Sequence, residues 1–505
     1  MLLNQFPDKE EFSALATKHN VIPLCVEILA DTETPVSLLY KFYDGKGPVF
    51  LFESVEGGER WGRYSFLGTS ARSHILVFKK HVEVKENGSV QKIPHGGKPL
   101  DVLKTLMKEY RPASLPGLPR FWGGMVGYLT YEMVSFFEPV PCIIDDDKPL
   151  AHFIIPDEII IFDNIRNTLL GISISFTDDM KNPDKSYETS KARIDAMLEN
   201  MKKHVSFNNT TPAGGGLSLY AKQKPEIYLE HVRRTKEYIK AGDIIQAVIS
   251  QPFICDDAPD LWTLYRAQRY INPSPYLFFM HMNETALVGS SPETMVRLEN
   301  RVATLRPIAG TRKRGISEQE DRALADELLS DEKERAEHLM LVDLGRNDLG
   351  RVAETGTVQV TDLMIVERYS HVMHLVSSIT CDLEADFDAW DLLAATFPAG
   401  TLSGAPKVRA MEIISELEKE PRGPYGGAVG YISFHGNMDM AITIRTACVD
   451  SGKLTVRAGA GIVADSIPEH ELAETVNKAM AIQKALQLMH KNGRIQEDHY
   501  DTYDR

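Results

Sequence analysis

Short apolar runs bounded by turn-forming residues dominate the first two hundred positions. The runs 49–53, 74–78, 159–162 and 169–176 are rich in β-branched and aromatic residues and have the lengths of strands. The last two lie close together in the sequence and predict one antiparallel pair, whereas 185–204 predicts a helix. This part of the chain therefore combines strands with short helices.

The second half begins with an amphipathic helical pattern over 225–241 that ends at Gly242. A strand is expected over 244–250, a hairpin over 276–288 and mostly helix over 316–344. Strands and helices do not alternate with the regularity of a doubly wound sheet.

The C-terminal pattern returns to strands. The segment 427–463 predicts three antiparallel strands with turns at 436–437 and 451–452. A helix over 469–490 and a polar tail over 493–505 follow. Together the patterns predict the α+β class: a two-part fold with large antiparallel β-sheets, a β-sandwich-like core and flanking helices.

One polar, glycine-rich segment divides the chain. Residues 207–217 combine Asn, Thr and Pro with three consecutive glycines, which is the composition of a linker. We place an N-terminal domain at 1–206 and a second domain at 218–492. A chain of 505 residues commonly divides in this way.

Composition excludes several functional classes. The net charge of −15, from 71 acidic and 56 basic residues, argues against a nucleic-acid-binding surface but allows a local anion site. The five cysteines have neither zinc-site nor disulfide spacing. No apolar run reaches the roughly 20 residues of a membrane span, and acids near the N-terminus do not fit a signal peptide. A cytoplasmic protein without a membrane partner is expected.

Four glutamates form two pairs with helical spacing. Glu334 and Glu337 lie three residues apart, as do Glu471 and Glu474, so each pair shares a helix face. Such carboxylates suit Mg²⁺, which takes oxygen ligands from one or two acids, substrate and water. The same spacing is also common on solvated helices, and Glu474 can simply pair with Lys478.

Basic and turn-forming residues precede the first glutamate pair. The Gly-Thr turn within 306–312 is surrounded in sequence by Arg306, Arg312, Lys313 and Arg314. This predicts an anion cradle beside a carboxylate pair. Such a site would suit an acidic small molecule held with a divalent metal.

A loop of small residues and an isolated arginine are further candidates. The loop 397–407 can present N–H groups and the Thr401 and Ser403 hydroxyls to an anion, or can be an ordinary capped loop that leads into a helix near Pro406. Arg445 interrupts an apolar strand, so it needs a carboxylate partner from a ligand or from the protein.

Two weaker signals lie nearby. Gly459, Gly461 and Ala464 match a relaxed dinucleotide pattern, but no strand with the ribose-binding acid follows. These glycines more simply allow close approach of the backbone to a ligand or a strand. His374 lies in an apolar strand, where a histidine is more often a packed core residue than a catalyst.

In their order along the chain, these motifs resemble the chorismate-utilising enzymes, most closely the anthranilate synthase component I family. The resemblance covers about residues 51–478 and rests on PIAGT, KERAEH, LMLVDLGRND, VMHLVS, PAGTLSGAPK, PYGGAVGY, IRTA and RAGAGIVADS. It implies that chorismate is aminated by ammonia, loses its ring hydroxyl and eliminates pyruvate to give anthranilate, the first step of tryptophan biosynthesis.

The resemblance also implies residue roles. The implied catalytic residues are His374, Glu293, Glu334 and Thr401. The implied substrate-binding residues are Gly310, Thr311, Tyr425, Arg445, Gly459, Ala460 and Gly461. The implied Mg²⁺ ligands are Glu337, Glu471 and Glu474. In this scheme Glu293 helps the hydroxyl leave, His374 assists proton removal during pyruvate loss, and Arg445 holds the pyruvyl carboxylate.

Two positions separate sister activities of the family. Relatives that add water carry a lysine base where this chain has Gln246, and aminodeoxychorismate synthases carry a lysine nucleophile where it has Ala309. Both substitutions favour anthranilate. The alternatives are an aminodeoxychorismate or aminodeoxyisochorismate synthase, or a catalytically inactive tryptophan-binding regulator.

The resemblance extends to regulation and assembly. Glu53, Ser54, Pro275, Tyr276 and Leu277 match motifs that bind L-tryptophan as a feedback inhibitor. None of the cysteines lies in the glycine-flanked nucleophile elbow of an amidotransferase. A separate glutamine amidotransferase subunit is therefore the implied source of ammonia, in a heterotetramer.

Overall fold

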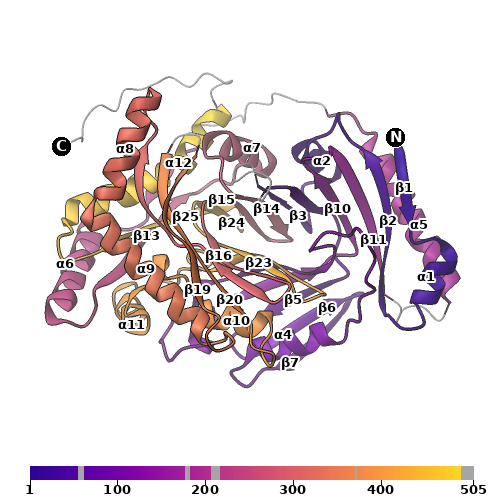
Figure 1. Cartoon of the computed structure of the whole chain (residues 1–505), viewed down its shortest axis with the longest axis horizontal. Helices are drawn as coiled ribbons and strands as arrows, with labels where there is room; N and C mark the ends of the chain where they lie inside the picture. Colours follow the sequence, from indigo (N-terminus) through magenta and orange to yellow (C-terminus); the bar gives the residue numbers. More distant parts are fainter. Residues whose placement is uncertain (55–61, 177–181, 206–216, 370–371, 491–505) are drawn as a thin grey trace.

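The computed structural model describes residues 1–54, 62–176, 182–205, 217–369 and 372–490. Two large antiparallel sheets form the centre of the molecule and helices lie outside them (Figure 1). The predicted α+β class with large antiparallel sheets is confirmed. Most of the predicted linker and the polar tail lie outside the described residues.

The first sheet has 13 strands within the described part of the chain. In spatial order they are β1 (Leu2–Phe6), β2 (Val21–Leu29), β11 (Thr168–Phe176), β10 (Glu158–Asp163), β4 (Tyr64–Gly68), β3 (Val49–Glu53), β14 (Tyr276–Met282), β15 (Thr285–Ser291), β24 (Thr446–Asp450), β25 (Lys453–Ile462), β13 (Gln246–Cys255) and β12 (Tyr220–Ala221), with β21 (Gly404–Ala405) paired to β13.

The second sheet has 12 strands, counted over the same described ranges. Their order is β18 (Ile308–Lys313), β20 (Val372–Asp382), β17 (Val302–Leu305), β16 (Thr294–Glu299), β23 (Met438–Ile442), β22 (Ala428–Ser433), β8 (Gly124–Leu129), β9 (Ala151–Ile155), β5 (Ser73–Val77), β6 (His81–Glu86) and β7 (Ser89–Pro94), with β19 (Gln359–Arg368) paired to β20.

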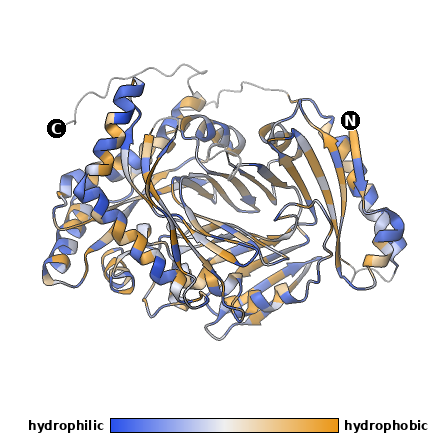
Figure 2. Cartoon of the chain, viewed as in Figure 1, coloured by the Kyte–Doolittle hydropathy of each residue, from blue (hydrophilic) through white to orange (hydrophobic). Residues whose placement is uncertain are grey.

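Helices cover the outside of the two sheets, with polar outer surfaces around largely apolar strands (Figure 2). They are α1 (Lys9–Leu15), α2 (Pro35–Phe42), α4 (Pro99–Lys108), α5 (Pro183–Met201), α6 (Pro225–Ala241), α7 (Leu261–Ile271), α8 (Glu318–Ser330), α9 (Glu332–Gly350), α10 (Ala389–Thr396), α11 (Lys407–Leu417) and α12 (Pro468–His490), with short 3-10 turns η1 (Tyr131–Phe136) and η3 (Gly400–Leu402). Among the described residues, no helix has the length and apolarity needed to cross a membrane.

The main hydrophobic core lies between the two sheets. Phe66 and Phe278 of the first sheet belong to one buried cluster with Phe121 and Tyr431, and the Phe66 and Tyr431 rings meet edge to face at 5.7 Å between centroids. Burial of such large apolar surfaces is the main favourable contribution to folding. The core therefore matches the predicted sandwich-like arrangement.

Both sheets join strands from the two sides of the predicted linker. In the first sheet, Glu53 of β3 pairs with Leu277 of β14. In the second, Gly127 of β8 pairs with Gly430 of β22. The proposed boundary near residue 207 thus separates stretches of sequence that share their sheets, and the division into two domains stays a prediction.

Several predicted elements match the structure. The pair β10–β11 and the hairpin β14–β15 form as expected. Helix α6 has the predicted bounds and ends at Gly242, whose φ of +84° places it in the left-handed region that glycine adopts without strain. The Gly242 N–H donates to the Ile239 and Tyr238 carbonyls, which closes the last turn of the helix.

The prediction of three strands over 427–463 is wrong. The structure has four strands there, β22 and β23 in the second sheet and β24 and β25 in the first. The chain crosses between sheets around Arg445, whose φ of +48° breaks the extended backbone. Arg445 therefore lies at a crossover and not inside an apolar strand, because periodicity cannot distinguish one long strand from two that meet at a bend.

Candidate functional site

One cavity of about 400 Å³ gathers most of the predicted site residues. Strands β13, β18, β20 and β25 and helices α9 and α12 supply its walls. The predicted residues that line it are His374, Glu293, Glu334, Thr401, Thr311, Tyr425, Arg445, Gly459, Gly461, Glu337, Glu471 and Glu474. Its volume is in the range of sites that take small ligands. We call it the main cavity.

Two predicted residues do not line the main cavity. Ala460 is fully buried on β25, where it pairs with Ile249 of β13. Gly310 lies behind the wall with φ +66°, and a Cβ there would come within 3.1 Å of Glu334 Oε2. Gly310 therefore allows α9 to pack closely against β18.

The start of α9 places the first glutamate pair on the cavity wall. Asp331 caps this helix, because its side chain accepts hydrogen bonds from the Lys333 and Glu334 N–H groups. Glu334 and Glu337 then face the cavity from the first two turns. Burial and repulsion from Glu337 raise the pKa of Glu334, although Arg312 at 3.5 Å partly opposes this.

Helix α12 supplies the second pair from the opposite side. Burial raises the pKa of Glu471, and the neighbouring Glu474 charge raises it further. Glu474 forms an ion pair with Lys478 at 2.6 Å, and Lys478 Nζ also donates to the Gly459 carbonyl at 2.9 Å. The predicted Glu474–Lys478 pair therefore forms, between two side chains that line the main cavity and are 47% and 40% exposed.

The four glutamates line the main cavity and offer the oxygen ligands that Mg²⁺ prefers, without enclosing a metal position. No group of three or more acidic, histidine or cysteine side chains is arranged as a metal cage in the described ranges. Mg²⁺ usually needs only one or two protein carboxylates, with substrate and water completing its shell. Burial is the main cause of the raised pKa values of Glu334 and Glu471, and the charges of Glu337 and Glu474 raise them further. A bound cation would relieve this second contribution.

Glu293 is a buried acid at the end of β15. Its carboxylate Oε1 accepts a hydrogen bond from the Thr401 hydroxyl at 3.0 Å. Burial raises its pKa to about 7, although Thr401, Arg445 and Lys478 each act to lower it. A carboxyl with this pKa exists in both protonation states near neutral pH, which suits a general acid.

Arg445 presents a charge to the same space. Across the described chain its guanidinium has no hydrogen-bond or ion-pair partner. Burial lowers its pKa, whereas Glu293 and Tyr425 act in the opposite direction. A desolvated guanidinium without a partner is a strong site for a carboxylate ligand.

Two oxygen atoms of the neighbouring strand β18 contact the ring of His374 on β20. Its Nδ1 lies 3.0 Å from both the Gly310 carbonyl oxygen and the Thr311 hydroxyl oxygen. Since the carbonyl can only accept, the neutral ring carries its hydrogen on Nδ1 and a lone pair on Nε2. His374 is therefore oriented by β18 and lines the main cavity as a possible base.

The predicted anion cradle does not form. Arg306 pairs with Glu367, Arg312 with Glu327 and Asp331, and Arg314 with Asp321. None of these arginines is among the residues that line the main cavity. Acidic side chains on neighbouring elements form ion pairs with these arginines. The order of residues along the chain could not reveal those partners.

The loop 397–407 contributes one of its two predicted hydroxyls. Thr401 reaches the cavity, but Ser403 is fully buried and its hydroxyl donates to the Ala399 carbonyl at 3.0 Å. The loop then runs as β21 along the edge of β13, and α11 begins after Pro406 as predicted. The backbone partner of β21 is thus a strand and not an anion.

The two positions that separate sister activities both lie in the main cavity. Gln246 donates through Nε2 to Glu337 Oε1 at 3.2 Å. Ala309 lines the cavity from β18. Gly461 leaves room for Gln246, since a Cβ there would lie 2.4 Å from its amide nitrogen. Close approach, and not nucleotide binding, thus accounts for this glycine.

A second, smaller cavity of about 60 Å³ collects all five predicted effector residues, Glu53, Ser54, Pro275, Tyr276 and Leu277. Glu53 already accepts hydrogen bonds from Tyr265 and from Arg269 Nε at 3.2 Å. The Tyr276 hydroxyl donates to Asp439 at 2.9 Å. We call this space the inter-sheet cavity, because β3 and β14 line it from the first sheet and β16, β22 and β23 from the second.

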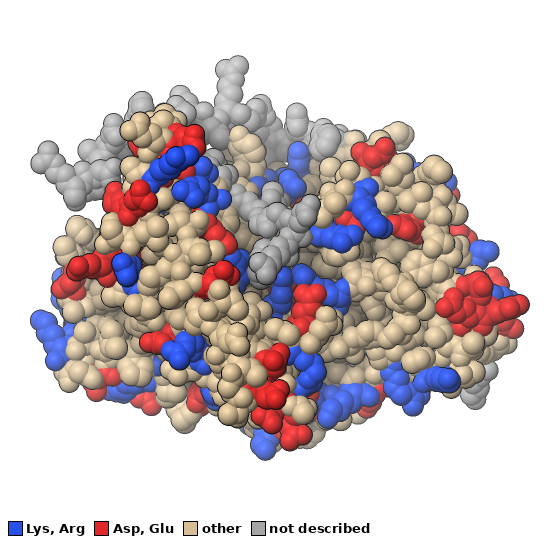
Figure 3. Space-filling model, in the orientation of Figure 1, with Lys and Arg blue, Asp and Glu red and all other residues tan. Residues whose placement is uncertain are grey.

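Sequence reasoning missed several charged residues around both cavities. Lys333 and Arg457 line the main cavity, and Arg120, Arg297 and Asp439 line the inter-sheet cavity. Arg445 was identified because a charged residue interrupted an apolar pattern, and the same criterion applies to Arg457. The sequence around Lys333, Arg120, Arg297 and Asp439 contains no comparable pattern. On the face shown in Figure 3, basic and acidic side chains intermingle without forming one basic surface.

A cavity of this size lined by charged residues suits an enzyme that acts on a small anion. Comparison with known families identifies the same class. Residues 51–484 match the family described as chorismate binding enzyme, and the chain belongs to this family.

Relatives narrow the assignment to the anthranilate synthase component 1 branch. The chain is 46% identical over 487 residues to that protein of Aquifex aeolicus, covering 95% of this chain and 97% of the relative. It is 44% identical over 495 residues to that of Acetivibrio thermocellus, covering 95% and 98%. The crystal structure of anthranilate synthase component I from Streptococcus pneumoniae TIGR4 matches with a TM-score of 0.75 and 36% identity, covering 90% of this chain and 98% of that chain.

Proposed function

We propose that this chain is the large subunit that converts chorismate and ammonia into anthranilate and pyruvate. The observation that carries the proposal is the convergence of the unpaired Arg445, the protonatable Glu293 and four glutamates on one cavity. Chorismate is a dicarboxylate, so its binding needs cationic partners. Loss of the ring hydroxyl and of the ring proton also needs groups that transfer protons. The main cavity offers both.

Binding is assigned to Arg445 and its neighbours. The guanidinium would hold the pyruvyl carboxylate through two parallel hydrogen bonds. Tyr425 lines the same wall, and burial raises its pKa to about 12, so its hydroxyl stays protonated and can donate. Gly459 and Gly461 line the same cavity and let the Tyr425 hydroxyl and the Gln246 amide lie close to the backbone of β25.

Glu337, Glu471 and Glu474 would hold Mg²⁺, with Glu334 in support. When bound, the ion would act as a Lewis acid and template for the ring carboxylate of chorismate. The arrangement leaves substrate and water to supply the remaining ligands, as this cation commonly requires.

Two groups would move protons. As ammonia forms its bond to the ring, the protonated Glu293 gives a proton to the departing hydroxyl, which leaves as water. In the second step His374 Nε2 accepts the ring proton as the bond to the enolpyruvyl oxygen breaks and the ring becomes aromatic. The departing enolpyruvate takes up a proton to become pyruvate.

The proposal of ammonia as the nucleophile rests on two cavity positions, 246 and 309, where sister enzymes carry a lysine and this chain does not. Gln246 is not a base that could activate water, and Ala309 cannot form a covalent intermediate. These residues support ammonia as the nucleophile and anthranilate as the product. The alternative, an aminodeoxychorismate or aminodeoxyisochorismate synthase, would stop before pyruvate elimination.

A glutamine amidotransferase is the proposed source of ammonia. The names of the relatives designate a component 1, which implies a second component. Burial raises the pKa of Cys25, Cys142, Cys381 and Cys448, which is the opposite of what a nucleophilic thiol needs. A separate subunit would therefore supply the hydrolysis of glutamine, in a heterotetramer.

The inter-sheet cavity is the proposed site of feedback inhibition by L-tryptophan. Its present volume of about 60 Å³ is smaller than the pockets of roughly 300 Å³ or more that hold ligands of this size. Binding would therefore have to move the surrounding side chains. An effector that selects a more open arrangement can regulate a distant site through that preference.

A direct assay tests the proposed function. Purified protein is incubated with chorismate, an ammonium salt and Mg²⁺, and anthranilate is followed by its fluorescence. We expect Mg²⁺-dependent formation of anthranilate and pyruvate in equal amounts. Accumulation of an aminated intermediate without pyruvate would support the sister synthase. Absence of any turnover, with tryptophan binding retained, would support the inactive regulator.

A further inference from the structure

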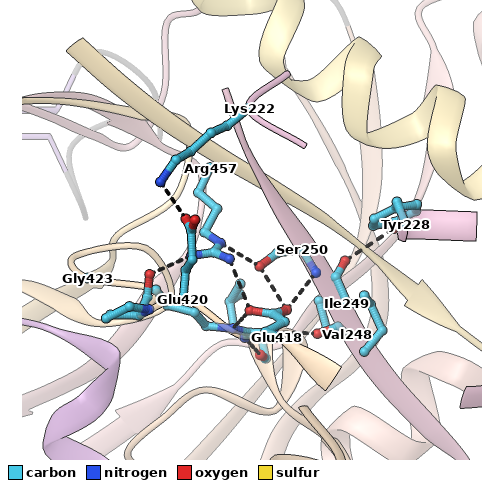
Figure 4. Close-up of polar contacts among 12 residues, drawn as sticks. Lys222, Tyr228, Val248, Ile249, Ser250, Glu418, Glu420, Gly423 and Arg457 are labelled. Carbon is cyan, nitrogen blue, oxygen red and sulfur yellow. Dashed lines mark hydrogen bonds and ion pairs between the residues drawn. The ribbon is translucent and has the colours of Figure 1, made fainter. Parts of the chain in front are cut away.

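A buried ion cluster lies behind one wall of the main cavity (Figure 4). Glu418 follows α11, Arg422 lies in the next loop, and Arg457 belongs to β25. Their side chains are only 4%, 2% and 7% exposed. Charges buried to this extent are unfavourable unless partners compensate them. The pairing within the cluster therefore matters.

Arg422 neutralises Glu418. Its Nε donates to Glu418 Oε2 at 2.9 Å and its Nη2 to Oε1 at 2.6 Å, which is a two-pronged ion pair. The remaining Arg422 donors reach the Leu402 and Val248 carbonyls at 2.8 and 2.7 Å. The guanidinium also lies over the Tyr131 ring at 4.6 Å. One acid and one base are thus fully matched.

Arg457 is left with excess charge. Its Nε donates to the Ser250 hydroxyl at 2.9 Å and its Nη1 to the Pro421 carbonyl at 2.6 Å, both of which are neutral acceptors. Its Nη2 lies 3.4 Å from Glu418 Oε2, an oxygen that Arg422 already engages. The two arginines hold the pKa of Glu418 below its usual value, so the carboxyl is ionised. Among these three side chains, two positive charges and one negative charge leave an excess of one positive charge.

The cluster holds Arg457 against the main cavity. Arg457 lines that cavity together with Val456 and Ala458. In Figure 4 the Glu418 carboxylate contacts both Ser250 of β13 and Arg457, and Ser250 and Arg457 also contact each other. A buried charge that exceeds its partners and faces a cavity marks a functional site, because nothing in the cluster itself requires it.

We infer that Arg457 is a further anion-attracting group of the main cavity, beside Arg445, and that Glu418, Arg422 and Ser250 are its positioning residues. The inference rests on the proposed function, in which the substrate carries two carboxylates. Arg445 accounts for a direct contact with one of them. Arg457 adds a fixed positive charge within the wall, which favours binding of the dianion through space without touching the reacting atoms.

Substitution of Arg457 separates charge from geometry. Arg457→Met leaves the balanced Glu418–Arg422 pair in place, so the fold is expected to survive, and Arg457→Gln is a second neutral variant that can still bond to Ser250. Arg457→Lys keeps the charge without the planar fork. The matched control is Arg233→Met, which removes an exposed arginine of α6 and causes the same change in net charge.

The readouts are chorismate KM, kcat and the binding of chorismate with Mg²⁺ measured by thermal shift. The neutral variants should raise KM by roughly tenfold while kcat changes much less. Arg457→Lys should stay within about threefold of the parent protein. In the neutral variants KM should also depend less on ionic strength, because one attractive charge is gone.

Two outcomes would overturn the inference alone. One is an unchanged KM in both neutral variants of an enzyme whose parent makes anthranilate. The other is an equal rise in KM for the lysine and neutral variants, which would make the guanidinium a structural brace. A parent protein that neither binds nor converts chorismate would overturn the proposed function, and the inference with it.

Discussion

Glu293 and Thr401 form the most informative pair of residues in the main cavity. Burial raises the pKa of Glu293 to about 7, and the hydrogen bond from the Thr401 hydroxyl opposes this rise together with the charges of Arg445 and Lys478. The two residues lie 108 positions apart in sequence. Motifs could supply both residue types, but not this hydrogen bond or the burial that sets the pKa.

The pH profile of kcat/KM tests this pair. In the proposed mechanism Glu293 must be protonated to assist departure of the hydroxyl, so activity should fall as pH rises through about 7 in the free enzyme. Thr401→Val removes a contact that favours the charged form. Its effect should therefore be to raise the pKa of Glu293 and move this alkaline limb to higher pH. The measurement needs free ammonia, rather than total ammonium, held constant across the series.

Glu293→Gln is the companion variant. It cannot transfer a proton, so kcat should fall by about 10²–10⁴ and the limb near neutral pH should disappear. A limb that persisted unchanged in this variant would assign it to another group. A Thr401→Val profile that moved to lower pH would contradict the proposed hydrogen-bond effect.

At the scale of elements, glycines let the strands approach each other at the junction of the two sequence halves. Gly127 of β8 and Gly430 of β22 pair directly. A Cβ at Gly127 would lie 2.1 Å from the His152 carbonyl oxygen, and one at Gly430 would lie 2.0 Å from the Asp439 carbonyl oxygen. Such contacts require the backbone to move, so side chains are excluded here.

Gly127→Ala should therefore destabilise the fold. Overpacking in a close-packed core costs about 1–3 kcal/mol, and the rigid backbone contact places this variant at the upper end. Chemical denaturation measures the loss as a lower midpoint with an unchanged slope. Gly350→Ala is the control, because its Cβ would meet nothing within 4 Å at the end of α9. Equal stability of both variants would contradict the packing argument.

Local patterns predicted many individual elements, but not how β22 to β25 are shared between sheets. Helix α6 and the β14–β15 hairpin follow from capping, turn residues and periodicity, all of which act over a few positions. The crossover at Arg445 depends on pairing with strands far away in sequence. The prediction of an anion cradle at 306–314 was wrong for the same reason. The acidic partners of these arginines come from α8, from the start of α9 and from β19.

At the scale of the whole molecule, a short series of contacts connects the inter-sheet cavity with the main cavity. Tyr276 lines the first cavity, and its hydroxyl lies 2.9 Å from the Thr294 hydroxyl. Thr294 is adjacent in sequence to Glu293, which lines the second. A rearrangement of the inter-sheet cavity would thus act close to the proposed general acid, provided that the effector favours one of two arrangements.

The proposed feedback inhibition by L-tryptophan provides the test at this scale. Ser54→Ala removes a hydroxyl from the inter-sheet cavity without altering the main cavity. A lost hydrogen bond to a charged group of tryptophan should raise the half-inhibitory concentration about tenfold or more, because such bonds contribute roughly 1.5–3 kcal/mol. Uninhibited kcat and chorismate KM should stay close to those of the parent. Titration of the anthranilate assay with L-tryptophan measures all three quantities. Full sensitivity in Ser54→Ala would place the effector elsewhere, whereas equal loss of activity and inhibition would show that the substitution disturbs the fold instead of the site.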